Sequence, residues 1–396
     1  MFNFPVEIVR EGAVNIVVPY LEAFKKAPGD YAPSKAPVFY NPRMRLNRDI
    51  AVLALQTYQR IVGRELSVSE PLAGCGVRGI RFAKEVKGIR RVYLNDINSE
   101  AFKMAQHNVH LNKLTHIVSG SNEDANLFLS QHAAPKKRFD YVDIDPFGSP
   151  VTYIDSGLRA TRDGGLLALT ATDMASLCGV YPKTALRKYG GLSLKTEYCH
   201  ELAVRLLAGC LAATAAKHDI GISIPFSHST DHYIRVYALV SYGAKKADES
   251  IRNMGYIYHC FQCFHRETIN NIISPVKEQC SECGAHMKVS GPLWLGKIAE
   301  KEFCENMEKE ASLRNVEPKI MKILSLIKSE SDEPTTYYVV DKICDKLGVP
   351  VPSLISVIKK LRGRCFVACP THFHARGVKT NASAKNVCEV IKEIAK

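Results

Sequence analysis

The chain has 396 residues and a formal net charge of +13, from 53 Lys and Arg against 40 Asp and Glu. Its 46% hydrophobic and 23% charged content excludes a disordered or low-complexity chain and predicts a soluble protein of two or three domains. Pro5, Glu7 and Arg10 interrupt the N-terminus, and no stretch approaches the roughly 18 apolar residues of a membrane span. We therefore expect a cytoplasmic protein with no membrane partner, whose basic excess favours a polyanion.

Residues 1–40 contain prolines at 19, 28, 33 and 37 and predict an extended N-terminal segment. A helical spacing of apolar residues follows at 47–58. Short apolar strands then alternate with helices, the strands at 66–73, 90–96, 116–120, 139–145 and 164–172, and the helices at 78–87, 98–112, 123–132 and 150–161. This alternation predicts an α/β fold with a mainly parallel sheet.

Residues 196–218 have helical spacing again, and 220–228 and 232–243 read as late, partly antiparallel strands. We therefore predict a domain over 41–243, followed by a smaller α+β domain over 244–396. The second domain contains a Cys-rich segment at 256–290, helices at 301–313 and 318–330, and then a helix, a helix and a strand pair over 336–380, an order that resembles a winged-helix-like unit. From Ser353 to Lys396 there are nine Lys or Arg and two Glu, which favours a nucleic-acid partner.

A glycine motif lies between the first strand and its helix, in the segment "LAGCGVRG". Gly74, Gly76 and Gly79 form G-x-G-x-x-G, which lets the backbone turn tightly and approach a ligand at the helix N-terminus. Asp96 ends the next strand, where it can accept hydrogen bonds from ribose hydroxyls. The motif alone suits NAD equally well, and a turn that only permits close packing remains the alternative.

Two further strand ends carry acids. Asp124 can accept from an adenine amine, or it can be a helix first-turn acid near the positive end of the dipole. Asp145 ends the strand "FDYVDID" and is followed by Pro146 and Phe147. Loops at successive carboxyl ends converge on one crevice, so Asp145 can take the proton of a nucleobase amine while Phe147 stacks on the base. The alternative is an Asp-Pro turn with a core Phe.

Several segments together resemble the tRNA (guanine(26)-N(2))-dimethyltransferase family, from about residue 38 to 380. They are "VFYNPRMRLNRDIAV", "GVRGIRFA", "LNDIN", "DIDPFGSP", "TATDMASLCG", "LRKYG", "HELAVRLL", "GPLWLG" and "THFHARGVKT". The resemblance implies a class I, Rossmann-like methyltransferase domain that uses S-adenosylmethionine to methylate the exocyclic amine of guanine 26 once or twice. It implies catalytic roles for Asp145 and Phe147, and cofactor contacts at Phe39, Arg48, Arg78, Asp96, Ile97, Asp124 and Ala125. Read without the family, Arg48 is a solvated charge on a helix, and His200, beside Glu201, is a structural histidine.

Four of the thirteen cysteines form a pattern. Cys260, Cys263, Cys280 and Cys283 have the spacing C-x2-C-x16-C-x2-C, which predicts a structural zinc ribbon. Reduced, metal-free thiols are the alternative, and the neighbouring histidines are not counted as ligands. The scattered cysteines, among them Cys75, Cys178, Cys199, Cys210 and Cys304, read as small buried apolar residues.

The sequence therefore predicts an S-adenosylmethionine-dependent tRNA (guanine-N(2)-)-methyltransferase with a zinc ribbon, a tRNA partner and no protein partner. Three other functions stay open. They are an amino-methyltransferase of DNA adenine or another RNA guanine, an NAD-dependent dehydrogenase, and a nucleic-acid-binding zinc protein that is not an enzyme.

Overall fold

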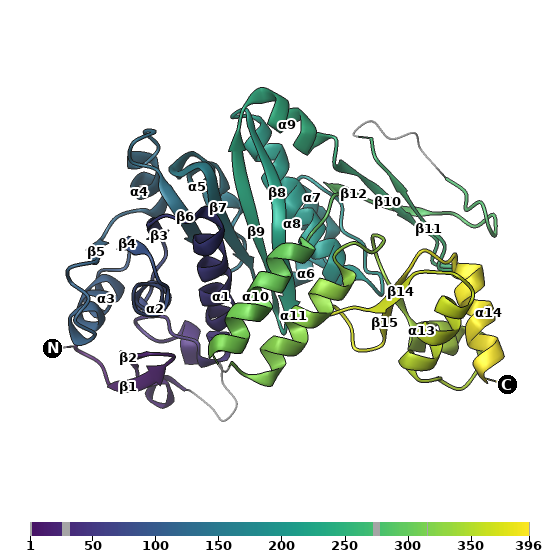
Figure 1. Cartoon of the computed structure of the whole chain (residues 1–396), viewed down its shortest axis with the longest axis horizontal. Coiled ribbons are helices and arrows are strands. Elements are labelled where there is room, and N and C mark those ends of the chain that lie inside the picture. The colour runs from purple at the N-terminus through teal and green to yellow at the C-terminus, as the bar shows by residue number, and fades with distance from the viewer. Residues whose placement is uncertain (1, 26–31, 272–277, 315, 396) are drawn as a thin grey trace. The chain divides into compact units, whose positions relative to one another are not determined.

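The computed structural model describes residues 2–25, 32–271, 278–314 and 316–395 (Figure 1). The chain forms two compact units. The first comprises Met1–Pro146, Thr152–Leu169 and Lys309–Ile320, and the second comprises Phe147–Val151, Thr170–Glu308 and Met321–Lys396.

The main sheet is mixed and seven-stranded, in the order β5-β4-β3-β6-β7-β9-β8. Its strands are β3 (Leu66–Glu70), β4 (Ile89–Asn95), β5 (Val118–Ser121), β6 (Phe139–Ile144), β7 (Thr161–Ala171), β8 (Ile220–Thr230) and β9 (Tyr233–Tyr242). The β3–β4, β3–β6, β4–β5 and β6–β7 pairs are parallel, and β8 and β9 are antiparallel. The predicted α/β fold is therefore confirmed, including the antiparallel late strands.

The helices of the first unit agree with the predicted ones to within a turn. They are α1 (Arg45–Val62), α2 (Val77–Glu85), α3 (Ser99–Leu111), α4 (Ala125–Gln131) and most of α5 (Val151–Ala160). Local signals set their ends: Gly63, at φ +65°, ends α1, and the side chain of Asn98 accepts the Glu100 N–H at the start of α3. Strand β6 is buried along its whole length, so the core extends through the middle of the sheet.

The N-terminal segment differs from the expected extended lead-in. It begins with an antiparallel hairpin, β1 (Val6–Glu11) and β2 (Val14–Pro19), which turns at Gly12 with φ +56°. Asn108 of α3 fixes the hairpin, because its side chain bonds the N–H of Val17 at 2.7 Å and the carbonyl of Val17 at 2.9 Å. The β-branched residues of "VNIVVP" were the signal for this strand. Short 3₁₀ turns follow at Leu21–Phe24, Ala32–Ser34 and Pro42–Met44.

The second unit is built around α8 (Cys199–Ala216), which contacts β8, β9 and β12 (Lys288–Trp294). Helix α8 is long and apolar enough to cross a membrane by length and composition, but 67% of it is buried inside the protein. Packing therefore accounts for its apolar character. Shorter helices lie nearby in the chain, namely α6 (Met174–Leu177), α7 (Pro182–Tyr189) and α9 (Ala244–Ile251).

The C-terminal region contains two three-stranded sheets. The first has the order β11-β10-β12, with β10 (Met254–His259) and β11 (Arg266–Ile269), and the second has the order β13-β15-β14, with β13 (Tyr338–Val339), β14 (Ala368–Pro370) and β15 (Gly377–Thr380). The helices are α10 (Lys301–Arg314), α11 (Pro318–Glu330), α12 (Val340–Leu347), α13 (Leu354–Gly363) and α14 (Ala384–Ala395). All but α14 were predicted, and α14 shares a buried core with α12 and α13.

Candidate functional site

The glycine motif forms a tight turn between β3 and α2. Gly76 has φ +79°, a conformation that L side chains rarely adopt, and a β-carbon on Gly79 would lie 2.3 Å from the Leu94 side chain. Asp96 is fixed at the same turn, because one carboxylate oxygen accepts the N–H of Gly74 at 2.7 Å and the other accepts the N–H of Asn98 at 2.9 Å. Burial raises the pKa of Asp96, and these two N–H groups oppose that shift.

Buried Asn95 holds three strand ends together. Its amide donates to the carbonyls of Pro71, after β3, and Glu123, after β5. Its side-chain oxygen accepts from the hydroxyl of Ser121 and the N–H of Glu123. The sequence analysis did not single out Asn95, because a buried strand residue beside a predicted site residue carries no separate pattern. It fixes the loops on which Asp96 and Asp124 lie.

The other predicted cofactor residues follow the same strand ends. Ile97 is 66% exposed, directly after Asp96. Asp124 caps α4, and its carboxylate accepts from the N–H groups of Asn126 and Leu127. Ala125 is buried at the first position of α4. Asp124 therefore has the structural role of a helix cap. Both of these hydrogen bonds use its Oδ1, so its Oδ2 can still contact a ligand.

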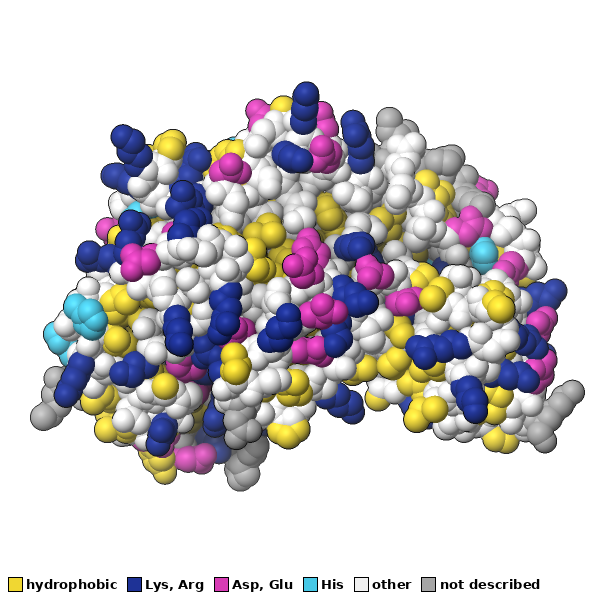
Figure 2. Space-filling view, viewed as in Figure 1, with side chains coloured by type: hydrophobic (Ala, Val, Ile, Leu, Met, Phe, Trp, Pro, Cys, Tyr) yellow, Lys and Arg dark blue, Asp and Glu magenta, His cyan; other side chains and the backbone are white. Residues whose placement is uncertain are grey.

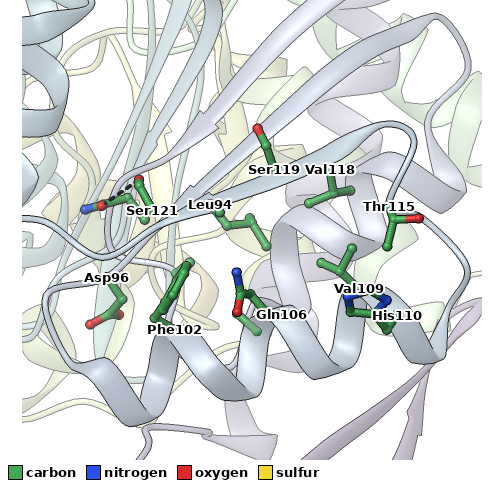
Figure 3. A pocket seen from close by; sticks show the side chains of 14 residues that line it. Leu94, Asp96, Phe102, Gln106, Val109, His110, Thr115, Val118, Ser119 and Ser121 are labelled. Carbon is green, nitrogen blue, oxygen red and sulfur yellow. Dashed lines mark hydrogen bonds between the residues drawn. The ribbon is translucent and has the colours of Figure 1, made fainter.

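A cavity of about 280 Å³ opens beside this edge of the sheet (Figure 3). It lies between α3, which contributes Phe102, Gln106 and Val109, and the strand side that carries Leu94 and Val118. Of the predicted cofactor residues, only Asp96 lines it. The cavity therefore has both polar and apolar walls, and among the predicted cofactor residues it meets only Asp96.

Arg78 of α2 is the centre of an acidic cluster. It is 2% exposed, and its guanidinium forms an ion pair with Asp145. Its Nε also lies 3.6 Å from Glu70 of β3 and 3.6 Å from Asp143 of β6. Burial raises the pKa of Glu70 to about 8, with Arg78 opposing the shift and Asp143 adding to it. The raised pKa favours the protonated form of Glu70 at neutral pH, beside the ion pair of Arg78 and Asp145.

Asp145 and Phe147 follow the carboxyl end of β6. The side chain of Asp145 is 19% exposed, in contrast to the fully buried Asp143 two residues earlier. Phe147 is 69% exposed, so the alternative of a core Phe is wrong. Thr172 fixes the next residue, because Gly148 donates its N–H to the Thr172 hydroxyl at 2.9 Å and accepts the Thr172 N–H at 2.8 Å.

Arg48 is engaged within the protein. Its guanidinium binds both carboxylate oxygens of Glu11, each at 2.6 Å, and donates to the carbonyl of Asn41 at 3.1 Å. Burial alone would raise the pKa of Glu11, but Arg48 and Arg81 bring it below its usual range. Arg48 is thus neither a solvated charge nor an open anion site, and it ties α1 to the N-terminal hairpin. The neighbouring Phe39 is half-buried, and its carbonyl lies beside Gly74.

Comparison with known proteins identifies the family. The family model of N2,N2-dimethylguanosine tRNA methyltransferases matches residues 12–392. The chain belongs to this family. It is 40% identical to the tRNA (guanine(26)-N(2))-dimethyltransferase of Methanobrevibacter smithii, over 100% of this chain and 99% of the relative. It is 38% identical to the tRNA (guanine(26)-N(2)/guanine(27)-N(2))-dimethyltransferase of Aquifex aeolicus, over 98% and 96%. Among solved structures, Trm1 from Pyrococcus horikoshii, described as a complex with S-adenosyl-L-methionine, has a TM-score of 0.84 and 32% identity, over 97% of this chain and 99% of that one.

The sulfur atoms of four cysteines in the second unit of the chain lie close together. All lie within 4.8 Å of one another, with Cys260 and Cys283 at 3.5 Å and Cys263 and Cys280 at 3.5 Å. The two Cys-x-x-Cys loops are built alike: the fifth residue of each, Phe264 or Gly284, has positive φ and donates its N–H to the carbonyl of the first cysteine. The predicted ligands are thus brought together, in a form that suits a tetrahedral ion.

Glu70, Asp143 and Glu11 were missed as partners of the predicted arginines. For Asp143 a signal existed, because residues two apart on a strand point to the same side, and Asp143 and Asp145 have that spacing. For Glu11 there was none, since its partner Arg48 lies 37 residues away along the chain.

Proposed function

We propose that this chain transfers methyl groups from S-adenosylmethionine to the exocyclic amine of guanine 26 in tRNA, once or twice. Family membership supports the reaction class. The observation that carries the assignment to particular residues is the Arg78–Asp145 pair, because it fixes a partly exposed carboxylate at the end of β6. The neighbouring parallel strands end at the glycine turn and at Asp96, on the same edge of the sheet.

The residues at this edge suit the cofactor. Asp96 presents a carboxylate to the ribose hydroxyls, and exposed Ile97 offers an apolar face to the adenine ring. Asp124 and Ala125 bound the adenine side, and Phe39 lies beside the glycine turn. When bound, S-adenosylmethionine supplies an activated methyl group. The chain's own task is then to position the amine in line with that group and to take its proton.

Asp145 is the group that takes the proton. The lone pair of a guanine amine is delocalised into the ring, so a carboxylate that accepts its hydrogen both orients the amine and receives the proton as the new bond forms. Arg78 holds the carboxylate in place and limits its rotation. Phe147, with 69% of its side chain exposed, stacks on the extruded base.

The test uses an unmodified tRNA transcript, a labelled methyl donor and nucleoside mass spectrometry. We expect mono- and dimethylated guanosine, and loss of both when adenosine replaces guanosine at position 26. Methylation that persists on this transcript and disappears when position 27 is replaced would instead indicate the second site named for the Aquifex relative. Methylation of DNA adenine and none of tRNA would reject the proposal.

A surface for tRNA backbone phosphates is proposed on α7. Lys183 and Arg187 are exposed there beside Tyr181, which is 59% exposed, so cations and an aromatic ring lie together. Tyr189 of the same helix donates to Asp173 at 2.6 Å, and Asp173 follows Thr172, the partner of Gly148. Arg187→Glu should weaken tRNA binding, whereas Lys136→Glu, at an exposed site before β6, should not. Equal affinities for the two variants would contradict this surface.

The C-terminal charge excess supports a tRNA role less strongly than the sequence indicated. Figure 2 shows Lys and Arg spread over the visible face without a single cluster. Lys379 is buried, and Lys360 and Arg364 pair with Glu393. We therefore assign tRNA contact in this region to the exposed cations of α13 and α14, such as Lys385, within a winged-helix-like unit.

A structural zinc ion in a ribbon over 256–290 completes the proposal, with Cys260, Cys263, Cys280 and Cys283 as ligands. Part of that segment, 272–277, lies outside the described residues. The ribbon belongs to a C-terminal domain over 244–396, after an N-terminal extension to residue 40 and a methyltransferase domain over 41–243. All thirteen cysteines are free, which supports the reducing cytoplasm as the location.

A further inference from the structure

A second group of metal-ligating side chains lies in the second unit, away from the zinc ribbon in sequence. It consists of Cys178, just after α6, and Cys199 and His200, the first two residues of α8. One ligand atom from each residue lies within 4.8 Å of the other two. None of the three is fully buried, so an ion can reach the group from solvent.

The surroundings orient these side chains toward one another. The backbone carbonyl of Phe373 lies next to the ring of His200, where it can accept a hydrogen bond from one ring nitrogen and leave the other for a ligand. The thiol of Cys178 donates to the carbonyl of Cys199 at 3.6 Å. An outer hydrogen bond that fixes a histidine is the usual support of a metal ligand.

We propose that Cys178, Cys199 and His200 bind a soft divalent cation, with zinc as the expected ion. Two thiolates and one imidazole are a ligand set that zinc accepts, and a water molecule fills the fourth position of a tetrahedral site. Ligand atoms that surround one zinc ion lie closer to one another than 4.8 Å. The sulfur and nitrogen atoms would therefore approach one another by up to about 1 Å when the ion binds. Two thiols alone would also suit a disulfide, but His200 has no part in a disulfide, and its presence favours the metal.

The ion would brace the loop that carries Phe147. Cys178 follows α6, which begins directly after Asp173, and the adjacent Thr172 exchanges two hydrogen bonds with Gly148. Joining Cys178 to the first turn of α8 therefore ties this segment to the core helix of the unit. The role is structural, and it does not depend on the proposed reaction.

The test measures zinc bound per full-length chain after equilibration in buffered zinc under reducing conditions. We compare the wild type with Cys178→Ser, with His200→Asn and with the control Cys210→Ser, a half-buried cysteine of the same helix α8 outside the group. Cys178→Ser should lose one ion, His200→Asn should bind that ion roughly tenfold more weakly or worse, and Cys210→Ser should match the wild type. Circular dichroism verifies that each variant is folded.

A second measurement on the unaltered chain avoids any folding defect. Alkylation rates of single cysteines are followed by peptide mass spectrometry with and without added zinc, and exposed Cys365 is the internal control. Zinc should slow alkylation of Cys178 and Cys199 and leave Cys365 unchanged. Equal zinc content in all variants, or unchanged alkylation of Cys178 and Cys199, would overturn the site. A Cys178–Cys199 disulfide with no zinc protection would also overturn it.

Discussion

Replacement of Lys379 by Met tests the buried ion cluster of the second unit. Lys379 is 1% exposed, and its ammonium lies 3.0 Å from one oxygen of Glu201, which is itself fully buried. The other oxygen of Glu201 accepts from Arg205 at 2.9 Å and from the N–H of Thr336 at 2.9 Å. Burial alone would raise the pKa of Glu201, but Lys379, Arg205 and the Thr336 N–H bring it to about 2.

Two considerations set the scale of the effect. A shift from 4.5 to about 2 corresponds to roughly 3 kcal/mol of stabilisation of the carboxylate, which Lys379, Arg205 and the Thr336 N–H provide together. Removing one partner of a buried pair typically costs about 3–5 kcal/mol, because the other charge stays buried without compensation. We therefore expect Lys379→Met to lower the free energy of unfolding by about 3 kcal/mol at neutral pH.

Urea unfolding followed by circular dichroism measures this loss. Because the folded pKa of Glu201 lies below its ordinary value, the stabilisation is complete above pH 4.5 and disappears as the pH falls toward 2, so the variant and the wild type should converge in acid. Lys385→Met, at an exposed site on α14, is the control. Glu201→Gln combined with Lys379→Met should recover part of the loss. A loss below about 0.5 kcal/mol, the range of ordinary surface substitutions, would refute the reasoning.

Three further outcomes follow from the site. Asp145→Asn should keep S-adenosylmethionine binding, measured by calorimetry, and lose about 10²–10⁴-fold in methyl transfer to tRNA; near-normal turnover would remove its role. The pKa of Glu70 is raised to about 8, so the folded chain holds a proton that the unfolded chain releases, and the free energy of unfolding should fall as the pH rises from 4.5 to about 8. Glu70→Gln should flatten this decline, measured by urea unfolding at several pH values. An unchanged slope in the variant would contradict the raised pKa. Chelation of zinc should lower the melting temperature and abolish the protection of Cys260 against alkylation, whereas equal melting curves with and without chelator would argue against the ribbon.

Local patterns predicted much of the fold. The alternation of short apolar strands with amphipathic helices located β3 to β7 and α2 to α5, because each element there has its own hydrophobic period. The hairpin β1–β2 was not predicted, because the prolines of residues 1–40 favoured an extended segment without regular structure. Helix α14 was missed since its sequence continues a basic, polar stretch, and only its packing with α12 and α13 explains its apolar side.

The candidate site was predicted less completely, since sequence patterns identify which residues carry chemistry but not which charges neutralise them. Their position directly after the predicted strands located Asp96 and Asp145. It could not show that Arg48 binds Glu11, or that Arg78 lies beside three acidic side chains from two strands and a loop. Long-range pairs of this kind depend on the folded arrangement, and no local period records them.

Side chains from different segments that resemble the family form charge pairs in the folded chain. These pairs differ in how far they are exposed, and the difference indicates whether a pair can act on a ligand or only on stability. Arg78 of "GVRGIRFA" meets Asp145 of "DIDPFGSP" at the partly exposed end of β6. By contrast, Glu201 of "HELAVRLL" meets Lys379 of "THFHARGVKT" in the interior, and Arg205 donates to the carbonyl of Trp294 in "GPLWLG". A charge pair that water and substrate cannot reach can act only on folding, whereas a pair with one exposed carboxylate can act on a ligand. Glu201 and Lys379 are therefore expected to act on folding, and Asp145 is the partly exposed carboxylate for which we propose the role in the reaction.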